Sequence, residues 1–259
     1  MADHGWGLGE HNHWSKYTNW ETDARVPLIV RVPWKPHAMG KRTSAIVEHV
    51  DMYSLRPMCI SRIIFIAMFP ASKQSRREIS IDRNRYPSIA ELVGVAVDVT
   101  VESVDGASWA GLLDDPSGQN HQKLVAYSQF PRCWPSRDPT HTPSDYDHMQ
   151  RCLPNTGWDN QNMSFMGLSM RTESYRYTEW HRWLGRELRP DWDDGSTMIE
   201  LYNHTGDPPE STKISFEHFE NVNIYEENKE LAQQLGKQLR EFFEEHTSQI
   251  GAVDASVLK

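Results

Sequence analysis

The sequence predicts a mixed fold of strands and helices, in which an antiparallel sheet in the last third of the chain is covered by one amphipathic helix. Two patterns support this prediction. Large and polar residues alternate over two neighbouring stretches, as in paired strands, and apolar residues later recur at helical spacing. The chain has 259 residues, of which 38% are hydrophobic and 24% charged. That composition is typical of a globular protein with a sizeable core.

The earlier elements each carry a local signal. Residues Asp3–Thr22 are rich in Gly, His and Trp, which predicts a loop around a site. The β-branched run Arg25–Pro33 predicts a strand. Pro87–Gly94 predicts a short helix, because Pro stands at its first position and Gly follows it. Further strands are predicted at Leu124–Phe130, Phe165–Thr172, Tyr175–Trp183 and Met198–Tyr202.

Two longer stretches complete the prediction. Cys133–Gln161 is rich in Pro, Asp, Thr and Asn and is predicted to be a loop. Loops of that length within a compact domain are usually functional or disordered. Glu226–His246 is predicted to be a helix that packs on the sheet. Its apolar face consists of Leu231, Leu235, Leu239, Phe242 and Phe243.

Charge and cysteine content exclude several classes of protein. The net charge of −9 argues against a nucleic-acid partner, because phosphate binding needs a basic surface. Three cysteines are too few for a disulfide scaffold. No apolar run reaches the roughly 18 residues of a membrane span. The first residues show no basic-then-apolar signal region.

The charge is unevenly distributed along the chain. The stretch Ser54–Arg85 has a net charge of +5, which leaves −14 on the other 227 residues. It also contains the most apolar run of the sequence, Ile63–Phe69. A buried strand with a solvated basic flank and a basic patch for an anionic partner are both compatible with this composition.

Residues 3–16 contain the densest cluster of ligand-type side chains. An Asp-His pair followed by Gly suits the edge of a metal site, because a carboxylate binds a hard cation and glycine lets the backbone pass closely. Lys16, a dozen residues on, is placed to reach an anion held there. The alternative is a zinc triad of His4, His11 and His13, whose spacing fits neither a helical pair nor a zinc finger.

Several motifs, in order along the chain, resemble the type I sulfatases, and most closely the iduronate-2-sulfatase group. The resemblance covers most of residues 3–245. The matching stretches are Asp3–Lys16, Tyr17–Glu21, Arg25–Ile29, Ala126–Arg132, Met166–Thr172, Tyr175–Trp180 and Glu200–Pro208.

This resemblance implies a fold like that of alkaline phosphatase, with a large α/β domain and a smaller C-terminal antiparallel subdomain. Residues 1–125 would form the C-terminal part of the α/β domain. Residues 126–246 would form the subdomain with its antiparallel sheet and packing helix, and residues 247–259 a tail.

The family hydrolyses sulfate esters at a Ca²⁺ site, using a formylglycine nucleophile made from a cysteine. The match implies that Asp3 and His4 are metal-site residues and that the catalytic Lys16 contacts the sulfate. It further implies substrate-binding roles for Trp6, which would line the sugar pocket, and for Arg132, near the substrate entrance. Arg137 is a weaker candidate for holding the uronate carboxylate, because its loop departs from the family pattern.

The sequence departs from the family at two places. The family's nucleophile motif and paired aspartates precede the Asp-His-Gly motif, which here stands at residues 3–5. We therefore expect formylglycine only in a missing N-terminal half, and no turnover from this chain alone. Cys133 begins a minimal Cys-x-Pro-x-Arg pattern. This pattern lies in the substrate loop and lacks the family's continuation, so it is weak evidence for a nucleophile.

The second departure is the basic stretch. Removing residues 54–86 restores the family pattern, because Tyr53 then precedes Pro87. We interpret residues 54–86 as an aberrant insert, such as translated intron, that would form a poorly packed loop or break a helix if present.

Three hypotheses follow. The first is a portion of a sulfuric ester hydrolase that removes 2-O-sulfate from uronates of heparan or dermatan sulfate, with a sulfated glycosaminoglycan oligosaccharide as partner and a lysosomal parent family. The second is an inactive fragment or carbohydrate-binding module that uses its Trp-rich loops. The third is another metal hydrolase of the same superfamily, such as a phosphodiesterase. The position of Lys16 and the stretch Ser128–Arg132 argue against the third.

Overall fold

The computed structural model describes residues 2–52, 87–94, 106–121, 123–132, 164–185, 187–194, 198–205 and 220–250. The chain forms two compact units. Unit 1 combines residues 1–29 with 127–259, and unit 2 consists of residues 30–126. Within the described residues, no helix is both long and apolar enough to cross a membrane.

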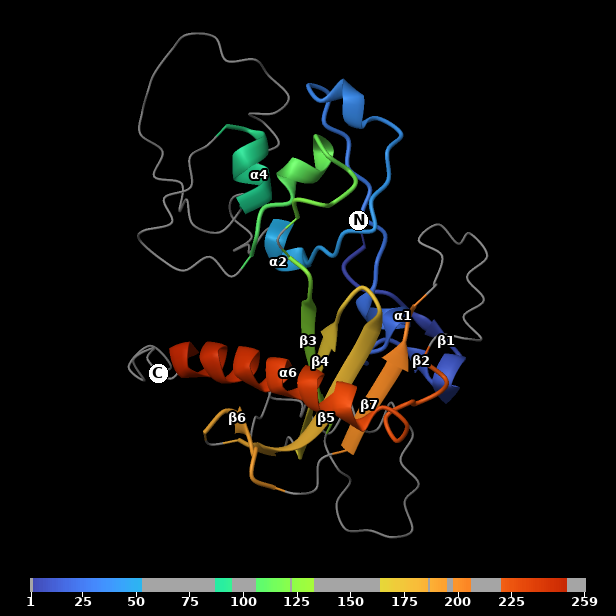
Figure 1. Cartoon of the computed structure of the whole chain (residues 1–259), viewed down its shortest axis with the longest axis vertical. Helices are drawn as coiled ribbons and strands as arrows, with labels where there is room; N and C mark the ends of the chain where they lie inside the picture. Colours follow the sequence, from blue (N-terminus) through green and yellow to red (C-terminus); the bar gives the residue numbers. More distant parts are fainter. Residues whose placement is uncertain are drawn as a thin grey trace. The chain divides into compact units, whose positions relative to one another are not determined.

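Unit 1 is built on an antiparallel sheet (Figure 1). β4 (Phe165–Arg171) and β5 (Tyr175–Leu184) form a hairpin in which Gly167 lies opposite Trp180. β7 (Met198–Asn203) pairs with the other edge of β5, and β6 (Arg189–Pro190) pairs with its end. β3 (Ala126–Arg132) lies next to β4.

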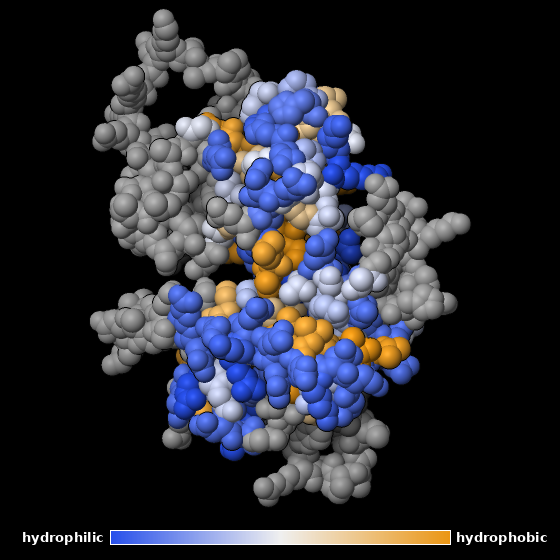
Figure 2. Space-filling model, viewed as in Figure 1, coloured by the Kyte–Doolittle hydropathy of each residue, from blue (hydrophilic) through white to orange (hydrophobic). Residues whose placement is uncertain are grey.

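The helix α6 (Lys229–Ile250) packs against this sheet along β4 and β5 (Figure 1). The core between them is mostly apolar, because apolar residues of the helix meet apolar residues of the strands. Its fully buried side chains include Leu168, Met170, Tyr177, Leu201 and Leu239. Phe242, further along α6, stacks on Tyr127 of β3 with ring centroids 3.6 Å apart. Figure 2 shows that polar residues cover most of the outward side of α6.

The N-terminal residues of unit 1 form a small hairpin and a short helix. β1 (Gly7–Leu8) pairs with β2 (Trp14–Ser15), and the 3-10 helix η1 (Glu10–Asn12) connects them. α1 (Glu21–Ala24) follows. The sequence predicted only a loop here, because two-residue strands are too short to give an alternating pattern.

Unit 2 contains short helical elements in the part of the chain that the structure describes. They are η2 (Pro36–Ala38), α2 (His49–Met52), α4 (Pro87–Leu92) and η3 (Ala110–Leu113). The fully buried Asp51 accepts hydrogen bonds from the backbone N–H groups of Glu48 and Ala107 and from Lys123. The buried Ser88 hydroxyl donates to the Asp51 carbonyl at 2.7 Å, which joins α4 to α2.

Most of the predicted elements are confirmed. The helix predicted at 87–94 is α4, which ends at Leu92 and is followed by a turn at Gly94 with a φ of +71°. The strands β3, β4, β5 and β7 lie within two residues of their predicted bounds. α6 begins three residues later than predicted, because residues 225–227 form a turn. The sheet and helix content is compatible with the predicted α/β class.

The predicted strand at 25–33 is wrong. These residues have no strand pairing, and the Ile29 side chain within them is 86% exposed. β-branched residues favour an extended backbone, but a strand also needs a partner, and no described strand offers one. The predicted loop at 133–161 and the insert at 54–86 lie outside the described residues. The division into domains at 1–125, 126–246 and 247–259 stays a prediction.

Candidate functional site

The predicted site residues at the N-terminus lie together in unit 1. The Nζ atom of Lys16 is 2.7 Å from Nε2 of His4, and a carboxylate oxygen of Asp3 is 3.5 Å from the same nitrogen. The hairpin explains this approach. Because Gly7 pairs with Ser15, the segments that precede β1 and follow β2 run side by side.

The hydrogen bonds determine the form of His4. A lysine ammonium has only donors, so Nε2 of His4 is the acceptor of the bond from Lys16. The proton of the ring is then on Nδ1, which donates to the carbonyl of Gly5 at 2.8 Å. His4 is therefore a neutral imidazole that orients a cation.

Asp3 is the exposed member of this group, with 89% of its side chain accessible. A hydrogen bond from its own backbone N–H lowers the pKa of its carboxyl group. The carboxylate is thus charged and accessible at neutral pH, as a ligand for a hard cation requires.

Lys16 lies in an unusual stretch of backbone. The residues on either side of it, Ser15 and Tyr17, have φ angles of +84° and +95°. Non-glycine residues rarely adopt positive φ, and strained backbone of this kind persists only where its surroundings hold it. Such residues cluster at functional sites, where the strain fixes a side chain.

Two side chains bind the backbone at Lys16. Nε2 of the buried His13 donates to the Lys16 carbonyl at 3.1 Å. Nη1 of Arg132, from the end of β3, donates to the next carbonyl, that of Tyr17, at 3.2 Å. The guanidinium of Arg132 also lies 5.6 Å from the ring centroid of Trp180. Arg132 is therefore next to the Lys16 segment, and its substrate-binding role stays a prediction.

The aromatic residues beside Lys16 are exposed. Trp6, whose ring lies 6.3 Å from that of His4, is 55% exposed, and Trp14 on β2 is 69% exposed. Leu8, opposite Trp14 in the hairpin, is 65% exposed. The exposed Trp6 is accessible to a ligand, as its predicted role requires.

The histidines of the alternative zinc triad have other contacts. His11 stacks on Trp20 at 4.2 Å, and His13 faces Lys16 and Asp23. Among the described residues, the three histidines of the alternative zinc triad do not form a metal-ligand group. Cys133 and Arg137 lie outside the described residues.

A buried ion network anchors this segment to the sheet, and no pattern in the sequence indicated it. Arg176 of β5 donates to Glu21 of α1 and to Glu220, each at 2.5 Å. His204 lies 3.2 Å from Glu220, and Arg171 lies 3.3 Å from Glu21. These charged residues form no local pattern in the sequence, and they are separated by up to 199 positions, so only the fold brings them together.

The carboxylates of this network titrate far from their usual range. Burial alone raises the pKa of Glu21, but the guanidinium groups of Arg176 and Arg171 outweigh it and lower that pKa to about 2. The pKa of Glu220 is also lowered, because Arg176 outweighs the effect of burial. Glu21, His204 and Glu220 have ligand atoms within 4.8 Å of one another. Since Arg176 already supplies the positive charge, the group is an ion network and not a metal site.

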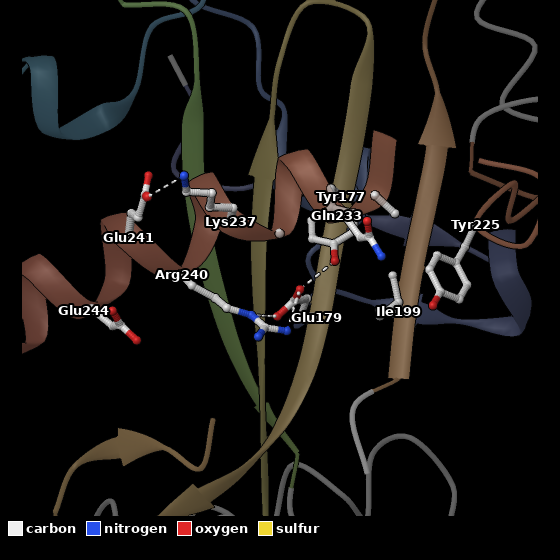
Figure 3. Close-up of a pocket in the computed structure, with 11 residues that line it drawn as sticks. Tyr177, Glu179, Ile199, Tyr225, Gln233, Lys237, Arg240, Glu241 and Glu244 are labelled. Atoms are coloured by element: carbon white, nitrogen blue, oxygen red, sulfur yellow. Dashed lines mark hydrogen bonds and ion pairs between the residues drawn. The ribbon is translucent and has the colours of Figure 1, made fainter. Parts of the chain in front are cut away.

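A second polar cluster lies under α6 (Figure 3). The buried Glu179 points from β5 toward the helix and accepts hydrogen bonds from Tyr177 at 2.6 Å and Arg240 at 3.0 Å. His181 lies 2.7 Å from the same carboxylate. Above the cluster is an open hollow of about 410 Å³. Because Arg240 belongs to α6 and Glu179 to β5, the cluster attaches α6 to the sheet.

Comparison with known proteins agrees with the motif analysis. The chain is 28% identical over 222 residues to iduronate 2-sulfatase of Homo sapiens, a match covering 80% of this chain and 36% of that protein. It is 26% identical over 223 residues to iduronate 2-sulfatase of Mus musculus, with the same coverage. This chain is sulfatase-like.

The sulfatase-like resemblance found in the motifs is thus confirmed. The chain spans only 36% of the length of the curated relatives it matches, or about a third. No family model matches the sequence.

Proposed function

We propose that residues 3–16 form one edge of a sulfate-ester-binding site of the iduronate-2-sulfatase type, in an alkaline-phosphatase-like fold. The observation that carries the proposal is the contact of Lys16 with His4, with the charged Asp3 beside them. The similarity to iduronate 2-sulfatases, which are named for this activity, supports the same conclusion.

In this proposal Lys16 binds the sulfate group. One of its three N–H bonds is used by His4, which leaves two to donate to sulfate oxygens. Hydrogen bonds between an ammonium and an anionic oxygen are stronger than neutral ones, so Lys16 would contribute most of the local affinity. His4 fixes the direction of the ammonium and does not itself carry charge.

Asp3 and His4 fit a metal ion only as part of a site. The Asp3 carboxylate suits Ca²⁺, which prefers oxygen ligands, whereas both ring nitrogens of His4 are engaged in hydrogen bonds. Among the described residues, the two belong to no group of three metal ligands. Further ligands would come from outside the described residues. Bound Ca²⁺ would supply positive charge against the sulfate oxygens.

Trp6 and Arg132 complete the proposed site. The exposed Trp6 ring would contact the sugar beside Lys16, and Arg132 holds the backbone at Tyr17. We propose 2-O-sulfated uronates of heparan or dermatan sulfate as the substrate class, and a lysosomal location as in the parent family. Turnover would need the nucleophile that the family places ahead of the Asp-His-Gly motif.

The proposal is tested by titrating the chain, with Ca²⁺ present, with a 2-O-sulfated iduronate disaccharide and with its 2-desulfated counterpart. We expect the sulfated disaccharide to bind more tightly. Lys16→Met should weaken its binding by about tenfold or more, because a charged hydrogen bond contributes about 1.5–3 kcal/mol. Isothermal titration calorimetry gives both affinities.

The matched control is Lys237→Met, because Lys237 is an exposed lysine of the same unit whose side chain is 77% accessible. It should leave binding unchanged. Equal binding of the sulfated and desulfated disaccharides would contradict the sulfatase proposal. That result would favour the alternative of a carbohydrate-binding module that uses the exposed Trp6 and Trp14.

A further inference from the structure

A buried histidine–aspartate pair lies directly beneath the Lys16 backbone. Nε2 of His13 is 3.1 Å from the Lys16 carbonyl and 3.8 Å from a carboxylate oxygen of Asp23. Both side chains are 5% exposed. A carbonyl has only lone pairs, so the proton of His13 is on Nε2 and is donated to Lys16.

Asp23 connects this pair to the other half of the site. Its backbone carbonyl accepts a hydrogen bond from the N–H of Gly5, the residue after His4, at 2.8 Å. Its carboxylate accepts one from the hydroxyl of Thr18 at 2.7 Å, two residues after Lys16. One residue of α1 therefore holds the segments that carry both His4 and Lys16.

Gly5 shows how closely the first segment is pressed onto α1. A Cβ atom at this position would lie 1.8 Å from the Thr22 carbonyl oxygen, which no side chain tolerates. The His4 segment is thus fixed by close contact with α1 as well as by the hydrogen bond to Asp23. Only the Lys16 segment, with its positive φ angles at Ser15 and Tyr17, needs side chains to hold it.

We propose that His13 and Asp23 are positioning residues that set the distance between Lys16 and His4, and thereby direct the Lys16 ammonium toward a bound sulfate. His13 acts through the Lys16 carbonyl and touches no ligand. The inference rests on the proposed function of Lys16 as the sulfate-binding residue. It assigns a role to His13 and Asp23, which are not among the site residues expected from the family resemblance.

The test compares His13→Leu, which removes the donor, with His13→Gln, which can place an amide N–H near the position of Nε2. The full chain is titrated with inorganic sulfate in each case. We expect His13→Leu to weaken sulfate binding by about tenfold, since a donor to a held backbone carbonyl is lost, and His13→Gln to restore most of the affinity.

The matched control is His11→Leu. His11 lies in the same hairpin and stacks on Trp20, but its known contacts do not include the Lys16 carbonyl. Urea denaturation of all variants reports their stability separately. If His11→Leu weakens sulfate binding as much as His13→Leu does, or if the loss merely follows the loss of stability, the positioning role is overturned.

A ligand-free measurement separates this inference from the proposed function. Nuclear Overhauser contacts between the His4 ring proton and the Lys16 Hε protons report the His4–Lys16 distance directly. We expect these contacts in the wild-type chain and in His13→Gln, and their loss in His13→Leu. If wild-type binds no sulfate, the proposed function fails. If the contacts survive in His13→Leu, the positioning inference fails.

Discussion

The guanidinium of Arg176 is enclosed by the sheet and neutralised by two carboxylates from distant parts of the chain, Glu21 and Glu220. Removing one partner from a buried ion pair leaves an uncompensated charge, which costs far more than the loss of a surface pair. Single substitutions in this network therefore affect the whole of unit 1. The pKa of Glu21 makes the effect visible as a dependence on pH.

We expect acid to destabilise unit 1 as the pH falls from about 4.5 toward 2. The pKa of Glu21 is 4.5 in a free chain and about 2 in the fold. A lowered pKa gives stability that is fully present above the unfolded value and is lost below it, here about 3 kcal/mol. Urea denaturation at a series of pH values measures this change.

The variant Glu21→Gln tests the assignment. It should lower the free energy of unfolding at pH 7 by about 3 kcal/mol, because Arg176 loses a partner. It should also flatten the loss between pH 4.5 and 2. Glu241→Gln is the control, because its pair with Lys237 is exposed and should change stability by less than about 0.5 kcal/mol. A pH profile in Glu21→Gln identical to that of wild-type would contradict the prediction.

Gly236 of α6 lies so close to the sheet that one added carbon atom would disturb the packing. A Cβ atom there would lie 2.6 Å from a carboxylate oxygen of Glu179 and 2.8 Å from the Tyr177 hydroxyl. We expect Gly236→Ala to destabilise unit 1 by about 1–3 kcal/mol through overpacking, although alanine favours a helix. Chemical denaturation measures the change.

Gln234→Ala, an exposed position of the same helix, provides the comparison. It should be neutral or slightly stabilising, because alanine is the better helix former and the Gln234 side chain is exposed. Gly236→Ala as stable as wild-type would mean that α6 shifts away from Glu179 without cost.

At this scale the sequence predicted Asp3, His4 and Lys16 because they lie within fourteen positions and match a motif. It could not predict the partners of Arg176, since Glu21 and Glu220 are separated by 199 positions and neither carries a local signal. The role of His13 was missed for a different reason. It was considered as a metal ligand, and only the structure shows that it binds the Lys16 carbonyl.

Among the elements, those with a self-contained pattern were predicted well. β4 and β5 alternate large and polar residues, and the Thr172 hydroxyl accepts a hydrogen bond from the N–H of Tyr175 at the turn between them. α6 shows its apolar face in the sequence. The run at 25–33 has the composition of a strand, but no described strand pairs with it. Local sequence could not show this, because pairing depends on a neighbouring strand that local sequence does not specify.

The contacts between α2 and α4 indicate whether the fold of unit 2 needs residues 54–86. α2 ends at Met52 and α4 begins at Pro87, and the Ser88 hydroxyl donates to the Asp51 carbonyl. Trp109 donates its backbone N–H to the same hydroxyl at 3.0 Å. The described residues on either side of the segment are therefore held together by contacts that do not involve it.

We expect a variant that lacks residues 54–86, and so joins Tyr53 to Pro87, to keep unit 2 folded. Its free energy of unfolding should equal that of the full chain or exceed it by about 1 kcal/mol, because closing a long loop costs entropy. Thermal unfolding of the two chains gives the comparison.

The control is a deletion of residues 87–92, which removes α4 together with Ser88 and should destabilise unit 2 strongly. A lower melting temperature after deletion of 54–86 would show that these residues contribute to the fold. The same result would contradict their interpretation as an aberrant insert.

For the whole molecule, the charge of −9 is the sum of +5 on residues 54–85 and −14 on the remaining residues. The resemblance to iduronate 2-sulfatase covers 80% of the chain. The motifs predicted this resemblance because several of them occur in order. They could not predict the two compact units, in which residues 1–29 belong with residues 127–259. That grouping depends on contacts such as the hydrogen bond from Asn19 to the carbonyl of Gly167.

The residues that Asp23 holds together lie close to it in the sequence, and this affects how their geometry is inherited. Gly5, His13, Lys16 and Asp23 fall within nineteen consecutive positions, so genetic recombination elsewhere in the gene would pass their geometry on intact. Their anchors to the sheet, Arg132, Gly167 and Arg176, are encoded more than a hundred residues later. A chimaera that exchanged only the later segment would therefore retain the contacts of Asp23 with Gly5 and Thr18 and lose the contacts that attach these residues to the sheet.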